Sequence, residues 1–221
     1  MARLPRLVLP GQAHLIIQRG HNGQQVFADD PDRTAFLGAL AQAAATQPVQ
    51  VHGWALLDSE LRMMVTPATA AALSLFMQSL GRSYVSAYNR RHGRSGTLWD
   101  GRFRCAVVEA GETLLDALRW IDGQPGASTW TSATHRLGGR RDALLVDPPE
   151  YWQLGNTPFD REAAYGRLLD QGLSQVTTEQ LRAAAWGGWA LGSERFADEL
   201  ARSTPRPLRP RPRGRPRRLV P

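Results

Sequence analysis

Between residues 14 and 121, the chain alternates short apolar runs of strand length with longer runs whose apolar positions recur at helical spacing. Turn-prone segments, such as residues 21–23 and 93–96, separate these runs. Residues 30–32 (Asp-Pro-Asp) and Thr69 supply N-cap chemistry for two of the helices. The expected strands are residues 14–20, 51–57, 60–65 and 102–109, and the expected helices are residues 30–45, 70–92 and 112–121.

The order of these elements, β-α-β-β-α-β followed by a helix, is the split βαβ or ferredoxin-like plan. It predicts an α+β fold with a four-stranded antiparallel sheet, helices on one side, and the first and third strands in the middle. We expect this domain to span residues 1–130. Residues 131–201 are rich in loops and then helical, and residues 202–221 form an Arg/Pro tail that is expected to be disordered. The later helices are expected at about residues 160–171, 177–186 and 192–201.

The second and third strands form a hairpin around the turn Asp58-Ser59. Glu60 and Arg62 are two residues apart on the third strand, so their side chains share one face, opposite Leu61. An unpaired charge on a central strand would be costly to bury. The two residues are therefore either an ion pair at an exposed strand end or part of a face built for polar chemistry.

The chain of 221 residues has a net charge of +7, and all 27 basic residues are arginine. Eight arginines follow Glu199, where no acidic residue occurs, and the other 19 are balanced by 20 acidic residues. The single Cys105 excludes an internal disulfide, and no apolar run has the ~20 residues of a membrane-spanning helix. We expect a soluble, cytoplasmic protein without a membrane partner.

The tail contains the sequence Pro-Arg-Gly-Arg-Pro-Arg-Arg at residues 212–218, which looks like an AT-hook. An extended backbone with paired guanidinium groups suits the narrow, electronegative minor groove of A·T-rich DNA. Nonspecific contact with phosphates and a merely solubilising tail are two other interpretations. The candidate minor-groove contacts are Arg213, Arg215, Arg217 and Arg218.

A second basic patch extends from residue 82 to residue 104 and holds six arginines and one histidine against a single acid, Asp100. Aromatic residues are interleaved with the cations, a composition suited to backbone contact and base stacking. Alternatively, the arginines lie on a solvated helix face and the tyrosines turn into the core. The candidate DNA-binding residues here are Arg82, Tyr84, Tyr88, Arg90, Arg91, Arg94, Arg102 and Arg104.

The histidines predict no metal site, because no two of them have the spacing of ligands on one strand or helix. Cys105 lies in an apolar run and is expected to be an inert core thiol. The sequence contains no Ser-His-Asp set and no phosphate-cradling glycine loop.

Seven segments carry a resemblance to a known family. They are LVLPG (7–11), QRG (18–20), YNRRHGRSGTLW (88–99), GRFR (101–104), WTS (130–132), GWALGSERF (188–196) and RGRP (213–216). Together they resemble the single-tyrosine insertion-sequence transposases with a His-hydrophobic-His (HUH) motif, in particular the REP-associated branch. The resemblance runs nearly end to end and implies the same ferredoxin-like fold.

In that family, two histidines on the strand after the hairpin turn hold a divalent metal, Mg²⁺ or Mn²⁺, which polarises the scissile phosphate. A tyrosine on the third helix attacks the phosphate and leaves a covalent 5′-phosphotyrosine link. Neutral imidazoles ligate the cation, the metal offsets the developing charge, and a hydroxyl is needed as the nucleophile.

The resemblance aligns these motifs with residues 59–62 (Ser-Glu-Leu-Arg) and 120–125 (Trp-Ile-Asp-Gly-Gln-Pro). Glu60 retains oxygen ligands for magnesium, but Arg62 stays protonated and repels a cation, and Trp120 has no nucleophilic oxygen. The resemblance therefore implies a degenerate site with no intact catalytic residue, no metal ligand set and no cofactor. We expect Glu60 and Arg62 to neutralise each other, with Trp120 packed over the pair or stacked on a base.

The leading hypothesis is a DNA-binding protein of transposase descent that binds hairpin or single-stranded repeat DNA, is associated with the nucleoid, and has lost cleavage. The sequence leaves a homodimer open. The alternative is an active transposase or nickase with a rearranged site that uses Tyr84 or Tyr88. A third hypothesis is an RNA-binding or nucleic-acid chaperone role for the same basic patch.

Overall fold

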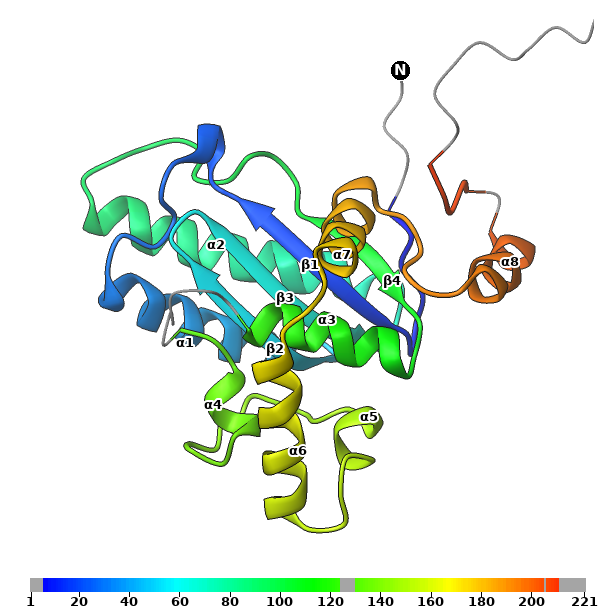
Figure 1. The fold of residues 1–221 in the computed structure, drawn as a ribbon. Coiled ribbons are helices and arrows are strands. Elements are labelled where there is room, and N and C mark those ends of the chain that lie inside the picture. The colour runs from blue at the N-terminus through cyan, green and yellow to red at the C-terminus, as the bar shows by residue number, and fades with distance from the viewer. Residues whose placement is uncertain (1–5, 124–129, 205, 211–221) are drawn as a thin grey trace, which may run out of the picture.

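The computed structural model describes residues 6–123, 130–204 and 206–210 (Figure 1). Among these residues, no helix is both long enough and apolar enough to cross a membrane. The strands are β1 (Ala13–Arg19), β2 (Val49–Leu57), β3 (Glu60–Pro67) and β4 (Arg104–Val108). The helices are the 3-10 turn η1 (His21–Gly23), α1 (Asp30–Thr46), α2 (Ala72–Arg91), α3 (Glu112–Asp122), α4 (Ala133–Arg136), α5 (Pro149–Trp152), α6 (Pro158–Gln171), α7 (Gln175–Gly187) and α8 (Glu194–Ser203).

The four strands form one antiparallel sheet in the order β2-β3-β1-β4. This order confirms the α+β, ferredoxin-like sheet and places β1 and β3 in its middle. In the β1–β3 ladder, Arg19 lies opposite Glu60 and Ile17 lies opposite Arg62. The charged pair on β3 therefore has a neighbouring strand on each side.

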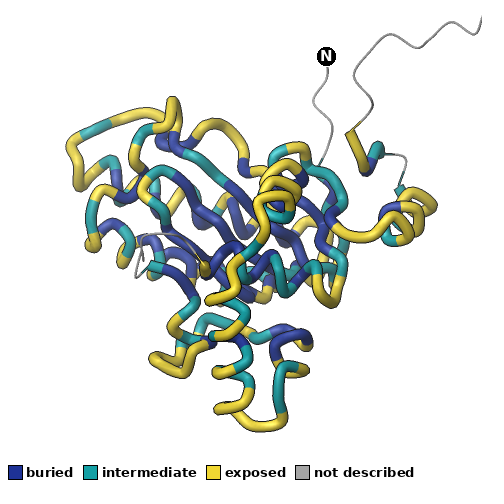
Figure 2. The backbone as a smooth tube through the Cα atoms, viewed as in Figure 1, coloured by how far each residue is buried: buried dark blue, intermediate teal, exposed yellow. Residues whose placement is uncertain are grey.

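The expectation that helices cover only one side of the sheet is wrong. Helices α1 and α2 pack on one face, against Leu61 and Met63, whereas α3 and α7 pack on the other, against Leu15 and Ile17 (Figure 1). Both faces are therefore buried along the central strands (Figure 2). The sequence carried the signal, because the apolar residues of β1 occupy consecutive positions rather than alternate ones.

Polar side chains determine where several helices begin. The Asp29 carboxylate accepts a hydrogen bond from the Asp32 amide at 3.1 Å and starts α1. Ser193 accepts one from the Phe196 amide at 3.1 Å and starts α8. The short helices α4 and α5 were not expected, because a single helical turn shows no hydrophobic periodicity.

The chain after α3 returns to the open edge of the sheet. Thr131 forms an antiparallel bridge with Ala55, and Leu145 forms a parallel bridge with Val51, so both segments pair with the edge strand β2. An edge strand that is paired in this way offers fewer free backbone groups to another chain. The division of the chain at residue 130 stays a prediction.

A fully buried ion pair joins this returning segment to the sheet domain. Nη1 of Arg136 on α4 lies 2.5 Å from Oδ2 of Asp122 at the end of α3, and neither side chain is exposed. The same carboxylate accepts hydrogen bonds from the Ser132 hydroxyl at 2.6 Å and the Tyr165 hydroxyl at 2.8 Å. Burial acts to lower the pKa of Arg136, but the neighbouring Asp122 raises it, so the guanidinium stays charged.

The structure does not describe the four candidate minor-groove contacts of the tail, which are Arg213, Arg215, Arg217 and Arg218. Their contact with an A·T minor groove stays a prediction.

We expect Asp122→Asn to lower the free energy of unfolding by about 3 kcal/mol, because it removes the nearer counter-charge of the buried Arg136, at 2.5 Å, and leaves only Asp147 at 3.8 Å. Urea denaturation measures this loss. The matched control is Asp198→Asn, which removes the partner of Arg209 in an exposed pair and should cost about 0–1 kcal/mol. Equal losses in the two variants would contradict this account of the buried pair.

Candidate functional site

Glu60 and Arg62 lie at the start of β3 and face the side of the sheet that α3 and α7 cover. Residue alternation along the strand sends Leu61 to the opposite face, into the core beneath α1 and α2. Ile17, the cross-strand neighbour of Arg62, belongs to the cluster packed under α3. The predicted orientation of the two charged side chains is therefore confirmed.

The two side chains form the ion pair that the sequence led us to expect. Nε of Arg62 lies 2.6 Å from Oε1 of Glu60, and the two side chains are only 7% and 8% exposed. A second arginine, Arg19 on β1, places its Nε 2.5 Å from Oε2 of the same carboxylate. Both oxygens of Glu60 thus accept a hydrogen bond from a guanidinium group.

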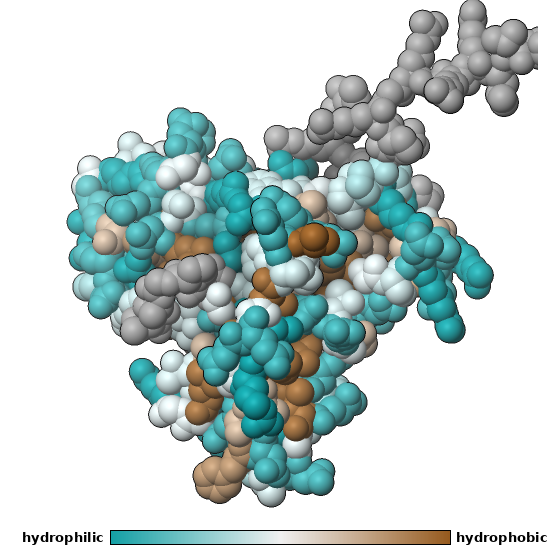
Figure 3. All heavy atoms as spheres, in the orientation of Figure 1, coloured by the Kyte–Doolittle hydropathy of each residue, from teal (hydrophilic) through white to brown (hydrophobic). Residues whose placement is uncertain are grey.

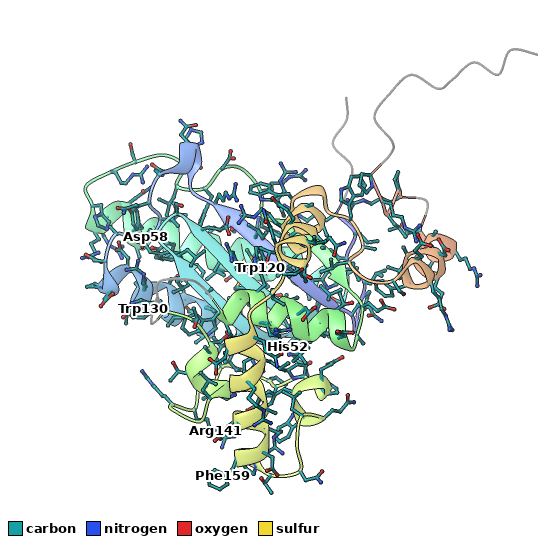
Figure 4. All side chains as sticks on the ribbon, viewed as in Figure 1. His52, Asp58, Trp120, Trp130, Arg141 and Phe159 are labelled. Carbon is teal, nitrogen blue, oxygen red and sulfur yellow. The ribbon has the colours of Figure 1, made fainter. Side chains whose placement is uncertain are left out.

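Trp120 on α3 covers this pair. The guanidinium carbon of Arg62 lies 3.9 Å from the centre of the Trp120 ring, a cation–π distance, and Nη1 of Arg62 donates to the Trp120 carbonyl at 3.4 Å. Trp120 is 5% exposed and lies between α3 and the sheet (Figure 4). Of the two expected positions for this ring, the one over the ion pair is observed.

The charges keep the pair ionised at neutral pH. Burial acts to raise the pKa of Glu60, but Arg62 and Arg19 lower it below its usual value. Burial lowers the pKa of Arg62, and Glu60 opposes that change. An arginine beside a carboxylate remains protonated, so the site holds a cation where a metal-binding site would need a neutral ligand.

Glu60 and Arg62 do not form a ligand set for a divalent metal. Both oxygens of Glu60 face guanidinium groups, and the charge of Arg62 would repel a metal cation. Across the part of the chain that the structure describes, no three His, Cys, Asp or Glu residues gather in a metal-binding cluster.

The site continues toward the edge of the sheet through an aromatic side chain that the sequence did not single out. Trp186 on α7 has the guanidinium carbon of Arg19 4.5 Å from its ring centre and that of Arg104 5.6 Å away. Arg19 was missed as well, although its pairing with Glu60 follows once β1 is placed beside β3. No local pattern predicts the position of Trp186, because it lies on a distant helix.

The two tyrosines of the basic patch lie in the core, as in the alternative that we left open. Tyr84 is 1% exposed and its hydroxyl donates to the Val26 carbonyl, and Tyr88 is 7% exposed. In this structure neither ring is exposed for stacking on a DNA base, which corrects the prediction that both residues bind DNA. Both continue the apolar stripe of α2, which packs against α1 and the sheet.

The arginines of the patch do not form one site. Arg91 makes ion pairs with Asp29 and Asp32 at the start of α1, and Arg94 donates to the Gln24 side chain at 3.2 Å. Arg82, on an earlier turn of α2, lines a hollow between α1 and α2. The exposed arginines are Arg82, Arg90, Arg91, Arg102 and Arg104.

A space-filling view shows where hydrophilic residues gather on one face of the molecule. Hydrophilic residues dominate the upper left of the molecule, where the end of α2 and the loop after it lie (Figure 3). The role of each of these residues in DNA binding stays a prediction.

The fold is similar to that of a solved transposase. The solved structure of a REP-associated tyrosine transposase bound to a REP hairpin superposes with a TM-score of 0.53 at 10% sequence identity, covering 67% of this chain and 99% of that one. This identity supports a shared fold only.

Two further solved structures are similar over parts of the chain. A putative transposase from Deinococcus radiodurans R1 has a TM-score of 0.38 at 14% identity, covering 49% of this chain and 88% of that one. The tRNA(His) guanylyltransferase of Saccharomyces cerevisiae also has a TM-score of 0.38, at 15% identity, covering 80% and 79%. With TM-scores this low, neither structure supports a conclusion about this chain. No protein-family model and no curated protein matches the chain.

The ion pair predicts a specific dependence of stability on pH. Since the pKa of Glu60 is lower in the folded protein than in the unfolded chain, its charge stabilises the fold above the unfolded value of about 4.3, and this stabilisation is lost as the pH falls through the folded value. We expect Glu60→Gln to cost about 3 kcal/mol near pH 7, and the difference from wild type to shrink below about pH 4.

Urea denaturation between about pH 7 and about pH 3 measures this difference. Glu199→Gln serves as the control, because its ion pair with Arg195 is exposed to solvent and should leave the stability nearly unchanged at both pH values. A Glu60→Gln difference that stays constant across this range would show that the buried carboxylate is not held in its charged form.

Proposed function

We propose that this protein binds DNA through a transposase-like fold and has lost the ability to cleave it. The target is hairpin or single-stranded repeat DNA. One observation carries the loss of cleavage: Glu60, Arg62 and Trp120 pack against one another. The single-tyrosine transposases that the sequence resembles need two imidazoles and a hydroxyl at these positions.

Each of these residues opposes the family's reaction. The family's reaction uses a metal ion, held by neutral ligands beside the scissile phosphate, and an oxygen nucleophile that attacks the phosphate. Arg62 brings a fixed charge that cannot ligate a metal, and Trp120 offers only an N–H donor. Restoring a metal site would also require Glu60 to leave two guanidinium groups.

The competing hypothesis, an active transposase with a relocated nucleophile, finds little support in α2. The Tyr84 hydroxyl is buried and donates to a backbone carbonyl, and burial raises its pKa further from neutral. Tyr88 is also buried, with its hydroxyl 3.4 Å from the Gln25 carbonyl. A nucleophilic hydroxyl must reach the phosphate, and both of these hydroxyls are turned into the protein toward backbone carbonyls.

Several features support DNA as the partner. Five exposed arginines lie between residues 82 and 104, and the net charge of the chain is +7. Guanidinium groups bind phosphates through paired hydrogen bonds, and positive charge draws a polyanion to the surface. The transposase of similar fold is described as bound to a REP hairpin.

The remaining features of the proposal concern place and assembly. The tail, with Arg213 and Arg215, contacts the minor groove of A·T-rich duplex beside the hairpin. The protein acts in the cytoplasm, in association with the nucleoid. A homodimer is compatible with the proposal and is not required by it.

We expect the affinity for hairpin DNA to fall by about 10³-fold or more between about 50 and about 200 mM salt, because some six phosphate contacts would each release a counterion. Fluorescence anisotropy with a labelled hairpin measures this dependence. Arg82→Gln and Arg90→Gln should each reduce the slope of the logarithmic salt plot by about one.

Arg167→Gln, an exposed substitution on α6, is the matched control and should leave the slope unchanged. An affinity independent of salt would overturn DNA binding led by phosphate contacts. Structured RNA that displaces the hairpin at equal concentration would instead favour the RNA-binding hypothesis.

A further inference from the structure

Four arginines from distant parts of the sequence line a pocket of about 280 Å³ beside β4. The volume lies near the lower end of the ~300–1,000 Å³ range of small-ligand sites. Trp186 and the glycines after it close one side. The charged residues that line the pocket are Arg6, Arg102, Arg104, Arg206 and a single acid, Asp100.

The two ends of the described chain are fixed at this pocket by buried neighbours. Leu7 and Leu208 are 6% and 5% exposed and pack together against Val107 of β4. The Ala190 amide donates to the Leu208 carbonyl at 3.0 Å. Arg6 and Arg206, one and two residues away from these anchors, therefore have defined positions at the pocket.

Direct contacts orient both of these guanidinium groups. Nε of Arg6 donates to the Phe103 carbonyl at 3.2 Å, and its guanidinium carbon lies 3.8 Å from the centre of the Phe103 ring. Nη2 of Arg206 donates to the Gly188 carbonyl at 2.7 Å. A Cβ atom at residue 188 would lie 2.7 Å from the same nitrogen, so the glycine permits this close approach.

The charge around the pocket is unbalanced. Burial lowers the pKa of Arg6, and the nearby charges of Arg102 and Arg104 lower it further. Four like charges with one carboxylate repel one another, and an anion among them would relieve that repulsion. An arginine fork matches a phosphate group better than a single chloride ion, because it can form paired hydrogen bonds with two phosphate oxygens.

The pocket also adjoins the closed site on the central strands. Arg104 and Arg19 both lie over the Trp186 ring, and Arg19 holds the Glu60 carboxylate. A strand that reached from the pocket past Trp186 would meet guanidinium groups along its backbone. Leu208 itself belongs to the Arg/Pro segment that begins at residue 202, so a described part of this segment lies beside the pocket.

We propose that Arg6, Arg102, Arg104 and Arg206 form a binding pocket for a phosphate group of a nucleic-acid strand. The pocket deepens the proposed DNA-binding function and rests on it for the source of the phosphate. That group is either a terminal phosphate or an internal phosphodiester of the strand.

Inorganic phosphate is the first probe, titrated against the full chain at constant ionic strength while Tm is recorded. Arg102→Gln/Arg104→Gln removes two exposed arginines of the pocket, and Arg140→Gln/Arg167→Gln removes two exposed arginines elsewhere. Phosphate also stabilises proteins nonspecifically, and the control pair measures that effect. We expect the half-saturating phosphate concentration to rise about tenfold or more in the pocket variant alone.

An equal half-saturating phosphate concentration in the pocket variant, the control variant and wild type would overturn the proposal that this pocket binds phosphate. Arg206→Gln is a second variant with the same expected direction, on a different segment of the chain. Phosphate binding that depends on the pocket in a protein that binds no DNA would uphold the pocket and overturn the proposed function. DNA binding without any such phosphate response would do the reverse.

Hairpins that end in a 5′-phosphate or a 5′-hydroxyl separate the two sources. A preference for the 5′-phosphate that is lost in Arg102→Gln/Arg104→Gln assigns a terminal phosphate. Equal binding of both hairpins, weakened alike in this variant and not in the control, assigns an internal phosphodiester. Hairpin affinity that is equal in the pocket variant and the control would overturn the assignment to nucleic acid.

Discussion

Arg62 lies inside the covered face of the sheet and keeps its charge, so the fold must hold an anion beside it. Glu60 supplies that anion two residues earlier on the same strand, and Trp120 covers the guanidinium from α3. This arrangement occupies the centre of the face with residues that stabilise one another. A metal ion would need the same space with neutral or anionic ligands in place of the Arg62 guanidinium, and an oxygen nucleophile would need the position of Trp120. The structural role of this pair and the proposed loss of cleavage therefore have one physical cause.

The same constraint is met again where the later part of the chain joins the sheet. Arg136 is fully buried and faces Asp122, which lies two residues after Trp120 on α3. The end of α3 thus connects the closed site to the segment that pairs with β2 and to α6. The exposed arginines between residues 82 and 104 lie away from this centre, on α2 and at β4. The proposed phosphate contacts are therefore separate from the buried, neutralised pair.

Much of the fold followed from local patterns. The strands, the longer helices and the shared face of Glu60 and Arg62 depend on apolar spacing and turn chemistry, which neighbouring residues determine. The sheet order followed from the order of these elements along the chain. The inward position of Tyr84 and Tyr88 was also predictable, because both continue a stripe of α2 at helical spacing. The contact between Arg19 and Trp186 was not predictable, because it depends on how a distant helix packs on the sheet. The pocket at β4 was not predictable for the same reason, since its arginines come from both ends and from the middle of the chain.

The central claim is that DNA is bound at this fold without being cut. Its most direct test is to incubate the wild-type protein with end-labelled hairpin DNA and Mg²⁺ or Mn²⁺, at a salt concentration where the complex forms, and then to denature the sample. The account predicts that the hairpin is bound before denaturation and that no covalent protein–DNA adduct remains afterwards. An adduct that disappears in Tyr84→Phe or Tyr88→Phe would contradict it, because the chain would then carry a working nucleophile outside the closed site.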